Sequence, residues 1–380
     1  MQALVFGAGN IGRGFLGQLL WEGSYEITFV DIDQPLVTAL NDRKGYPLRL
    51  VDGQGPTQNI QIDRVSAIDA RNTEGVCSAF SRSDLVLTSV GVSAFDKLAP
   101  VIAAGIMQRR QTDVPVDILL CENQWRASEM MLELLLPRLS GDERNFLETS
   151  VGLVEVVVGR MVPRPSKAVL AEDPLLVVAE PYHLLPCAKE MFRAGIPPVS
   201  GLEAEDNFDA YVARKLYLQV AGHAAFAYLG YPGHEFIWQC VEDSTVLNQV
   251  EPALDEAERA LAAKFGFKLD DLREFTAEML QRYRNEALGD TVERVAQDPM
   301  RKLRPEDRLI GAANMCLECG ITPIAFARII RSALRYDNPH DAAAVTMQRR
   351  IEEQGMLDFL RSHCKIAPNS ELERLILTSE

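Results

Sequence analysis

Positive charge is scarce in this sequence, and so are long apolar runs. Lysine and arginine number 39 against 54 aspartates and glutamates, which gives a formal net charge of −15 at pH 7. Nucleic acids and anionic membrane surfaces attract proteins with a positive field, so we expect neither as a partner. No segment holds the roughly 20 consecutive apolar residues that a membrane-spanning helix needs. A small molecule is therefore the expected partner.

Cysteine is also sparse. Seven cysteines, an odd number, are scattered through 380 residues, which favours reduced thiols over a disulfide framework. Cys316 and Cys319 have CxxC spacing, but no second pair or nearby histidine completes a tetrahedral site, so we predict no metal. The first residues, "MQALVFGAGN", lack a basic leader before the apolar run. We therefore expect a cytoplasmic protein.

Apolar residues are plentiful, at 47% of the chain, and two domains are the expectation at this length. In the first half, apolar runs of strand length alternate with helical patterns, which predicts a mostly parallel sheet. The predicted strands lie at 2–6, 25–31, 83–91, 116–123, 152–163 and 173–181.

A glycine-rich turn directly follows the first predicted strand. In "FGAGNIG", Gly7 permits a tight turn, Gly9 lets the backbone approach a pyrophosphate, and Gly12 allows close packing of helix on strand. Asp31 lies 19 residues beyond Gly12, at the end of the second strand, where a carboxylate can bind the ribose and would repel a 2′-phosphate. The pattern predicts NAD as the cofactor, bound also by the turn residues Ala8, Asn10 and Ile11.

A second turn, "TSVG" at 88–91, ends another predicted strand at the carboxyl edge of the sheet, where ligands bind in doubly wound folds. Its small residues, Ser89 and Val90, would let the nicotinamide side of the cofactor pass. An ordinary turn between strand and helix explains each residue nearly as well.

From Asp206 onward the pattern is helical almost throughout. The predicted helices lie at 207–229, 250–265, 269–285, 305–318, 323–335, 340–354 and 370–378. We place the domain boundary in "AGIPPVSG". The predicted fold is thus α/β, with a Rossmann-type, doubly wound NAD-binding domain over residues 1–195 and a mainly α-helical substrate domain over residues 196–380.

A lysine and a histidine share the apolar stretch "KLYLQVAGH". On an α-helix, Lys215 and His223 would differ by about 80° in azimuth and roughly 12 Å in rise, so both could reach one ligand. Burial lowers the pKa of a lysine, as a general base near neutral pH requires, and Asn123 at a strand tip could donate to a substrate oxygen. Taken singly, each has a simpler reading, because lysines usually keep their amine in water and histidines usually satisfy a core hydrogen bond.

Several motifs together resemble the polyol-specific long-chain dehydrogenases of the mannitol dehydrogenase family: "ALVFGAGNIGRGFLGQLL", "CEN" at 121–123, "RKLYLQVAGHAAFAYLG" and "DTVERVAQDPMRKLRPEDRLI". The resemblance implies a metal-independent, NAD-linked interconversion of a ketose with a polyol or a hexitol phosphate such as mannitol 1-phosphate. The family signature has a lysine base, an asparagine five residues on and a histidine three beyond that. Lys215 and His223 match the base and the substrate-binding histidine, and Asn123 matches the other amide that binds the alkoxide.

Three positions depart from the family pattern. Val220 stands where the signature asparagine is expected, and the loss of one such donor costs about 10² to 10³ in turnover. Gly159 stands where relatives usually carry an aspartate, and Glu286 where a proline is common. These departures leave the predicted fold and cofactor site intact and bear on the chemistry.

A basic cluster stands out in this acidic chain. Isolated charges of this kind more often form a solvated helix face, but guanidinium and ammonium groups can also hold a phosphate. The family match at "RKL" favours Arg301 and Lys302 as substrate-binding or bridging residues. The cluster comprises Arg294, Arg301, Lys302, Arg304 and Arg308.

Three functions are compatible with these observations. The first is an NAD-dependent polyol phosphate dehydrogenase with Lys215 as base, motivated by the glycine turn, Asp31 and the pair of Lys215 and His223. The second is an NAD-binding sensor that lost hydride transfer, motivated by Val220 and Gly159. The third is a sugar-acid (uronate) reductase that uses the same basic groups. Relatives of this long-chain type are often monomers, and we expect a monomer here.

Overall fold

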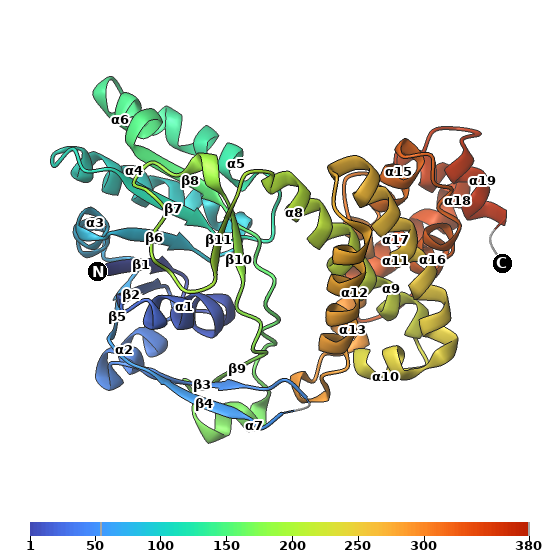
Figure 1. The fold of residues 1–380 in the computed structure, drawn as a ribbon, viewed down its shortest axis with the longest axis horizontal. Coiled ribbons are helices and arrows are strands. Elements are labelled where there is room, and N and C mark those ends of the chain that lie inside the picture. Colours follow the sequence, from blue (N-terminus) through green and yellow to red (C-terminus); the bar gives the residue numbers. More distant parts are fainter. Residues whose placement is uncertain (54, 379–380) are drawn as a thin grey trace. The chain divides into compact units, whose positions relative to one another are not determined.

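The computed structural model describes residues 1–53 and 55–378, and the chain divides into two compact units, Met1–Tyr211 and Val212–Glu380 (Figure 1). The segment that follows the predicted boundary at residue 195 lies in the first unit. It contains strand β11 (Leu202–Glu205), which pairs in parallel with β10 (Leu185–Ala188). This pairing ties the segment to the sheet-containing part of the chain.

The first unit is built on a six-stranded sheet whose strands all run parallel, in the order β5-β2-β1-β6-β7-β8. Numbered along the chain, these strands follow the 3-2-1-4-5-6 order of doubly wound dinucleotide-binding folds, so the predicted fold class is confirmed. The strands are β1 Gln2–Phe6, β2 Glu26–Asp31, β5 Val65–Asp69, β6 Leu85–Thr88, β7 Val116–Leu120 and β8 Val151–Glu155.

Helices cover both faces of this sheet, because successive residues of a strand point to opposite sides. In β1, Ala3 and Val5 enter one core, and Leu4 and Phe6 enter the other. The first core packs against α1 and α2, and the second against α3, α4, α5 and α6. These helices are α1 Gly17–Glu22, α2 Gln34–Arg43, α3 Thr73–Arg82, α4 Phe95–Arg110, α5 Ala127–Leu135 and α6 Asp142–Ser150.

A smaller sheet in the same unit pairs β3 (Tyr46–Leu50) with β4 (Gln58–Ile62) and with β9 (Val177–Ala179). The strands predicted at 152–163 and 173–181 are therefore shorter than expected, and they belong to different sheets. The remaining short elements of this unit are η2 Val92–Ala94, η3 Leu136–Arg138, α7 Lys167–Glu172 and η4 Lys189–Met191.

Helices make up the second unit, as predicted. The helix expected at 305–318 begins only at Ile310, because turn bonds such as that from the Asp307 amide to the Arg304 carbonyl occupy the preceding residues. Helix α8, which spans the boundary between the two units, and the elements after it are α8 Phe208–Arg214, η5 Lys215–Val220, α9 Ala221–Gly230, α10 Ile237–Glu242, α11 Ser244–Phe265, α12 Leu269–Tyr283, η6 Glu286–Leu288, α13 Val292–Ala296, α14 Pro299–Lys302, α15 Ile310–Glu318, α16 Ile324–Leu334, α17 Ala342–Gln354, α18 Met356–Ser362 and α19 Glu371–Thr378.

Two of the predicted helices contain π-helical segments. The helix after the glycine turn contains the π-helix η1 (Gly12–Leu16) near its start, and the helix expected at 207–229 is interrupted by the π-helix η5. In η1, side chains from elsewhere donate to carbonyls that the wider turns leave available: the Tyr46 hydroxyl to Arg13 O at 2.7 Å, and the Arg160 guanidinium to Gly14 O at 2.9 Å. Such inserted donors stabilise departures from α-helical bonding.

In the described part of the chain, no helix combines the length and the apolar character needed to cross a membrane.

Candidate active site

The glycine turn has the geometry that its spacing predicts. Gly7 has a φ of +97°, and a Cβ there would lie 2.6 Å from the carbonyl oxygen of Ser89. A Cβ on Gly12 would overlap the carbonyl oxygen of Gly7, whereas a Cβ on Gly9 would meet no heavy atom within 4 Å. The first and third glycines are thus required by close packing inside the protein. The space beside Gly9 is open to a ligand.

Asp31 ends strand β2 next to this turn, and both of its carboxylate oxygens are used. Oδ2 accepts a hydrogen bond from the Ala8 amide at 2.7 Å, and Oδ1 accepts one from the Asp33 amide at 3.0 Å. Each oxygen has a further lone pair for a ribose hydroxyl. Ile32, which follows, is 77% exposed and offers an apolar surface beside the carboxylate.

Other predicted cofactor residues lie around the same turn. The side-chain amide of Asn10 donates through Nδ2 to Pro163 O at 3.2 Å, and Ile11 is partly buried against the core. Ser89 follows β6, the neighbour of β1: its amide donates to Phe6 O at 2.8 Å and its hydroxyl to Gly7 O at 3.2 Å. The two predicted turns therefore meet where the strand order reverses.

Glu122 belongs to the "CEN" motif, but the sequence predicts no role for it. Its carboxylate, from the end of β7, accepts hydrogen bonds from the amides of Val90 and Gly91 at 3.0 and 2.8 Å. Asn123, the predicted amide donor, comes next and is exposed at the same edge of the sheet. An acidic residue directly after a buried strand is the signal that could have drawn attention to Glu122.

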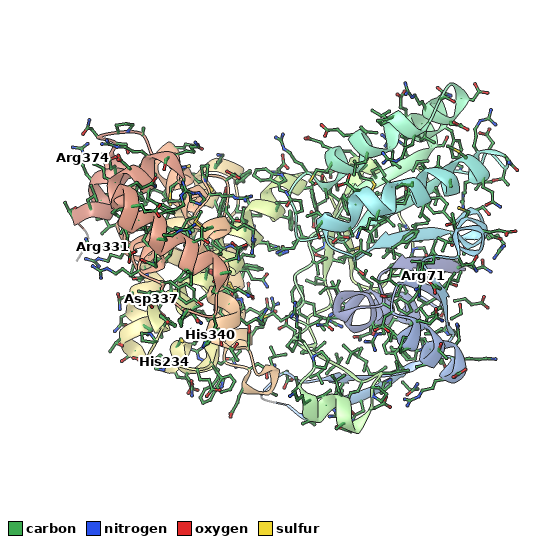
Figure 2. All side chains as sticks on the ribbon, turned by 180° about the vertical axis from the view of Figure 1, so that it is seen from behind. Arg71, His234, Arg331, Asp337, His340 and Arg374 are labelled. Carbon is green, nitrogen blue, oxygen red and sulfur yellow. The ribbon has the colours of Figure 1, made fainter. Side chains whose placement is uncertain are left out.

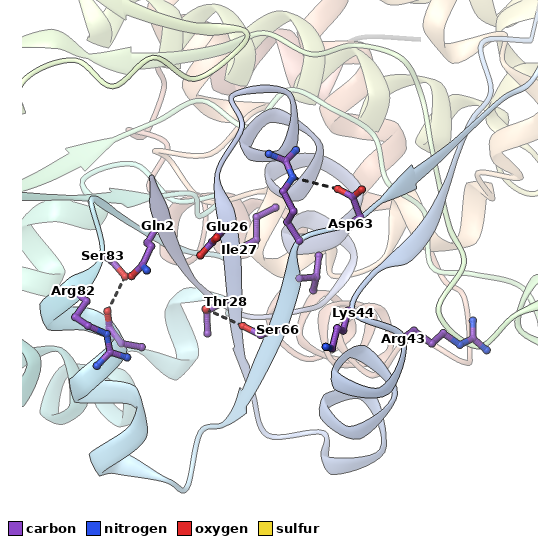
Figure 3. A pocket seen from close by; sticks show the side chains of 13 residues that line it. Gln2, Glu26, Ile27, Thr28, Arg43, Lys44, Asp63, Ser66, Arg82 and Ser83 are labelled. Carbon is purple, nitrogen blue, oxygen red and sulfur yellow. Dashed lines mark hydrogen bonds and ion pairs between the residues drawn. The ribbon is translucent and has the colours of Figure 1, made fainter.

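These residues fit a dinucleotide. The site has an open approach at Gly9, a helix start beyond it, a carboxylate for the ribose and an exposed apolar side chain beside that carboxylate. A cavity of about 590 Å³ in this unit is a different place (Figure 3). Its lining includes Gln2, Glu26 and Val65, the first residues of three parallel strands, so it lies at the amino edge of the sheet. Ligands of this fold bind at the carboxyl edge.

Lys215, in the second unit, is the first residue of the π-helix η5 and is only partly exposed. Burial, helped by the charge of Arg308, lowers the pKa of its ammonium group to about 8. The segment continues to Val220, and the Ala221 amide bonds to Leu216 O, five residues back. The Tyr283 hydroxyl donates to the Gln219 carbonyl in this segment.

The α-helical spacing predicted between Lys215 and His223 is therefore wrong. On an α-helix, residues five apart would differ by about 140° in azimuth. In a π-helix, whose hydrogen bonds join residues five apart, they lie on nearly the same side. Val220 thus shares a side of η5 with Lys215, and His223, three residues further on in α9, lies close to that side.

His223 is held by two contacts within the second unit. Its Nε2 lies 2.8 Å from Oδ2 of Asp290, and its ring stacks on Tyr283 with centroids 4.7 Å apart and an interplanar angle of 10°. Burial opposes ionisation of Asp290, but the contacts with His223 and Arg294 outweigh it and lower the pKa of this carboxyl group. A proton on Nε2 makes the contact with Asp290 attractive and leaves Nδ1 for a ligand.

The structure separates the basic cluster into paired and unpaired groups. Arg294 pairs with Asp290, Arg301 lies 3.2 Å from Asp298, and Arg308 lies 2.7 Å from Asp307. Arg304 is exposed.

Lys302 differs from these arginines. It is 3% exposed, and its ammonium group makes no hydrogen bond or ion pair with another described residue. Burial, with the nearby charges of Arg308 and Arg301, lowers its pKa to about 7. The charges of Asp298 and Asp307 oppose this shift, but within the described residues neither forms an ion pair with the amine, which leaves it for a ligand.

The remaining sequence features have structural explanations. A Cβ on Gly159 would lie 2.8 Å from the ring of Tyr182, so this ring occupies the space of the expected aspartate. Glu286 begins the short helix η6 and is exposed. The thiols of Cys316 and Cys319 each donate to a carbonyl of α11 at 3.5 Å. Within residues 1–53 and 55–378, no group of three or more His, Cys, Asp or Glu side chains could hold a metal.

A doubly wound sheet with a dinucleotide turn, followed by a helical unit with a half-buried lysine and a histidine, defines an oxidoreductase of the dehydrogenase class. Two family models match the chain: the mannitol dehydrogenase Rossmann domain over residues 1–201 and the mannitol dehydrogenase C-terminal domain over residues 207–371. The chain belongs to the mannitol dehydrogenase family.

Relatives of similar length carry a specific name. A mannitol-1-phosphate 5-dehydrogenase of Anoxybacillus flavithermus is 36% identical over 97% of this chain and 96% of its own length. One of Brevibacillus brevis is 35% identical over 99% of this chain and 96% of its own.

Solved structures agree with the fold. Mannitol 2-dehydrogenase of Pseudomonas fluorescens, in a ternary complex with NAD and D-mannitol, superposes with a TM-score of 0.80 at 17% identity, covering 99% of this chain and 90% of that one. A substrate-free D-sorbitol dehydrogenase gives 0.81 at 17% identity, covering 99% and 91%.

Proposed function

We propose that this chain is an NAD-dependent dehydrogenase that interconverts a polyol and the corresponding ketose, with Lys215 as the general base. The observation that carries the proposal is the half-buried amine of Lys215, whose pKa of about 8 lets it accept a proton near neutral pH. The amine shares a short stretch of helix with His223, in a chain whose other unit carries a dinucleotide turn.

Each residue has a defined task in this reaction. When bound, NAD would supply the hydride acceptor for the carbon that is oxidised. Lys215 takes the hydroxyl proton, and Asn123 donates a hydrogen bond to the oxygen as it gains charge. Nδ1 of His223, left available by the contact of Nε2 with Asp290, binds a neighbouring hydroxyl.

The finer proposal is that the polyol is a hexitol phosphate such as mannitol 1-phosphate. The names of the relatives support it, and so does the unpaired ammonium of Lys302, which with Arg301 would bind the phosphate. A sugar acid is the alternative, since its carboxylate suits the same groups. A panel of free hexitols, hexitol 1-phosphates and uronates, assayed for NADH formation or consumption, separates them. Turnover of none of them would contradict the proposal.

An NAD sensor is the second candidate, and Val220 is the observation that favours it. Without an amide at this position, one of the two expected donors to the alkoxide is missing, while the cofactor turn is intact. Tight NAD binding without turnover on the whole panel would support the sensor.

We propose further that the protein acts as a monomer in the cytoplasm and binds no nucleic acid. The formal charge of −15 supports the last point, because a phosphate backbone repels such a chain. Light scattering at working concentrations tests the oligomeric state, and a mass of twice 42.2 kDa would contradict a monomer.

A further inference from the structure

The carboxylate of Glu122 holds a turn on the neighbouring strand. The side chain is 6% exposed, and its two oxygens accept one hydrogen bond each from the amides of Val90 and Gly91. Bonds from amides to an ionised carboxylate are stronger than those between neutral groups. Gly91 has a φ of +82°, so the turn adopts a conformation that few side chains would permit. The turn is thus fixed from two sides, by its own glycine and by Glu122.

The contacts continue from this turn to the glycine turn. Ser89 directly precedes Val90 and Gly91. Its hydroxyl donates to Gly7 O, and its own carbonyl oxygen limits the space beside Gly7. These hydrogen bonds therefore connect the carboxyl ends of the neighbouring strands β7, β6 and β1. The strand order of the sheet reverses between β6 and β1. In this fold each half of the sheet binds one mononucleotide, and β6 and β7 belong to the second half.

We propose that Glu122 is a positioning residue for the nicotinamide half of NAD: it fixes the turn at residues 89–91 on which that half rests. The adenosine half depends instead on Asp31 and the glycine turn. The inference rests on the proposed function, because it assumes that NAD is the ligand. Since Asn123 follows Glu122 directly, the two hydrogen bonds of Glu122 also fix the backbone from which Asn123, the predicted amide donor, projects.

A matched control lies at the other end of the same strand. Asp117, in β7, is 1% exposed, and its carboxylate also accepts hydrogen bonds from two consecutive amides, those of Arg193 and Ala194. It lies near the amino end of β7, whereas Glu122 follows the carboxyl end. The two carboxylates make equivalent bonds and differ in their distance from the cofactor turns.

The experiment measures Kd for NAD and for ADP by calorimetry on the full chain carrying Glu122→Gln or Asp117→Asn. In Glu122→Gln the new NH₂ group faces a backbone N–H, so one of the two bonds is lost and the turn is released. We expect Kd for NAD to rise about tenfold or more and Kd for ADP to change less than about twofold. Asp117→Asn should lower the melting temperature and leave both Kd values within about twofold. Should Glu122→Gln fail to fold, Glu122→Asp, whose shorter side chain cannot reach both amides, should show the same selective loss.

An unchanged Kd for NAD in Glu122→Gln would overturn the inference, and so would an equal rise for NAD and ADP, which indicates a general effect on the fold. If the unmodified chain binds ADP but not NAD, the proposed function fails together with the inference. Normal NAD binding by the unmodified chain, with no selective loss in either Glu122 variant, overturns the inference alone.

Discussion

Val220 lies one π-helical turn beyond Lys215, so a side chain without a hydrogen-bond donor stands on the same side of the helix as the amine. Replacing it by asparagine would place an amide on the side of the helix that carries the Lys215 amine, next to the proposed alkoxide site. We expect Val220→Asn to raise kcat for polyol oxidation by about 10- to 100-fold, because a preorganised donor stabilises the developing alkoxide. Steady-state kinetics with the best substrate of the panel measures the gain.

Val220→Leu is the control for this change, since it alters volume without adding a donor and should not raise kcat. An equal gain in both variants would contradict the role of the amide. A gain by Val220→Asn from an undetectable starting rate would favour the sensor over the enzyme.

The lowered pKa of Lys215 predicts how the rate depends on pH. The amine accepts a proton only when neutral, which holds above its pKa of about 8. The kcat for polyol oxidation should therefore increase about tenfold per pH unit below pH 8 and level off above it. Profiles from pH 6 to pH 10 test this, and Lys215→Met should lose most of the rate at every pH. A profile of the same shape in that variant would show that another group is the base.

Lys302 should destabilise the fold near neutral pH. Its amine loses its proton at about pH 7 in the folded chain but keeps it to about pH 10.5 when unfolded. Between these values the unfolded state binds more protons, so stability rises with pH across this window. Lys302→Met should increase the free energy of unfolding at pH 7 by about 1 to 3 kcal/mol and flatten the rise. Urea unfolding at pH 7 and pH 9 measures both effects.

The exposed lysine Lys97 provides the comparison, and Lys97→Met should leave the pH dependence of unfolding unchanged. If Lys302→Met destabilises the protein at pH 7, the amine is compensated in the folded state and the prediction is wrong. The same variant should bind a hexitol phosphate more weakly than the unmodified chain, with a smaller effect on the free hexitol.

Asp31 should set the preference for NAD over NADP. Asp31→Ala removes both the ribose acceptor and the repulsion of a 2′-phosphate, and it releases the Ala8 amide. We expect Kd for NAD to rise about 10-fold or more while Kd for NADP changes little. Asp33→Ala is the neighbouring control: Asp33 caps α2, so its loss should cost about 1 kcal/mol of stability and leave the preference intact. An unaltered NAD preference in Asp31→Ala would exclude the assigned role.

Asp290 should affect binding of the polyol through its contact with His223. In Asp290→Asn the contact with Nε2 loses its charge, so the ring is held less firmly with Nδ1 available. We expect KM for the polyol to rise about 5- to 10-fold, with a smaller change in kcat. The second unit offers a matched pair, because Nε2 of His234, labelled in Figure 2, lies 2.9 Å from Oδ2 of Asp243. Asp243→Asn should leave KM unchanged, and equal effects of both variants would point to stability alone.

The sequence was most informative where one local pattern determines one geometry. Gly7, Gly9 and Gly12 have the conformation and open space that their spacing predicts, and the alternation of apolar runs predicted the parallel sheet. These features depend on neighbours in the chain, so a single sequence contains them. The helical second unit was predicted for the same reason.

The sequence was least informative where distant residues act together. The sequence predicts an α-helix where the π-helix η5 lies, since the Tyr283 hydroxyl that donates to Gln219 O comes from 64 residues further along. Asp290 and Glu122 lie within family motifs, yet their partners His223, Val90 and Gly91 become neighbours only through the tertiary fold. Their roles could not be predicted without coordinates.

The π-helix also sets the alignment of base and histidine. Lys215 and His223 are eight residues apart, which on an uninterrupted α-helix is about 80° in azimuth. The wider π-helical turn accommodates one extra residue and brings them near the alignment of residues seven apart on an α-helix, about 20°. Substitutions such as valine for asparagine at position 220 leave this alignment intact. The hydrogen-bonding pattern of the segment, more than the identity of its residues, keeps base and histidine in register.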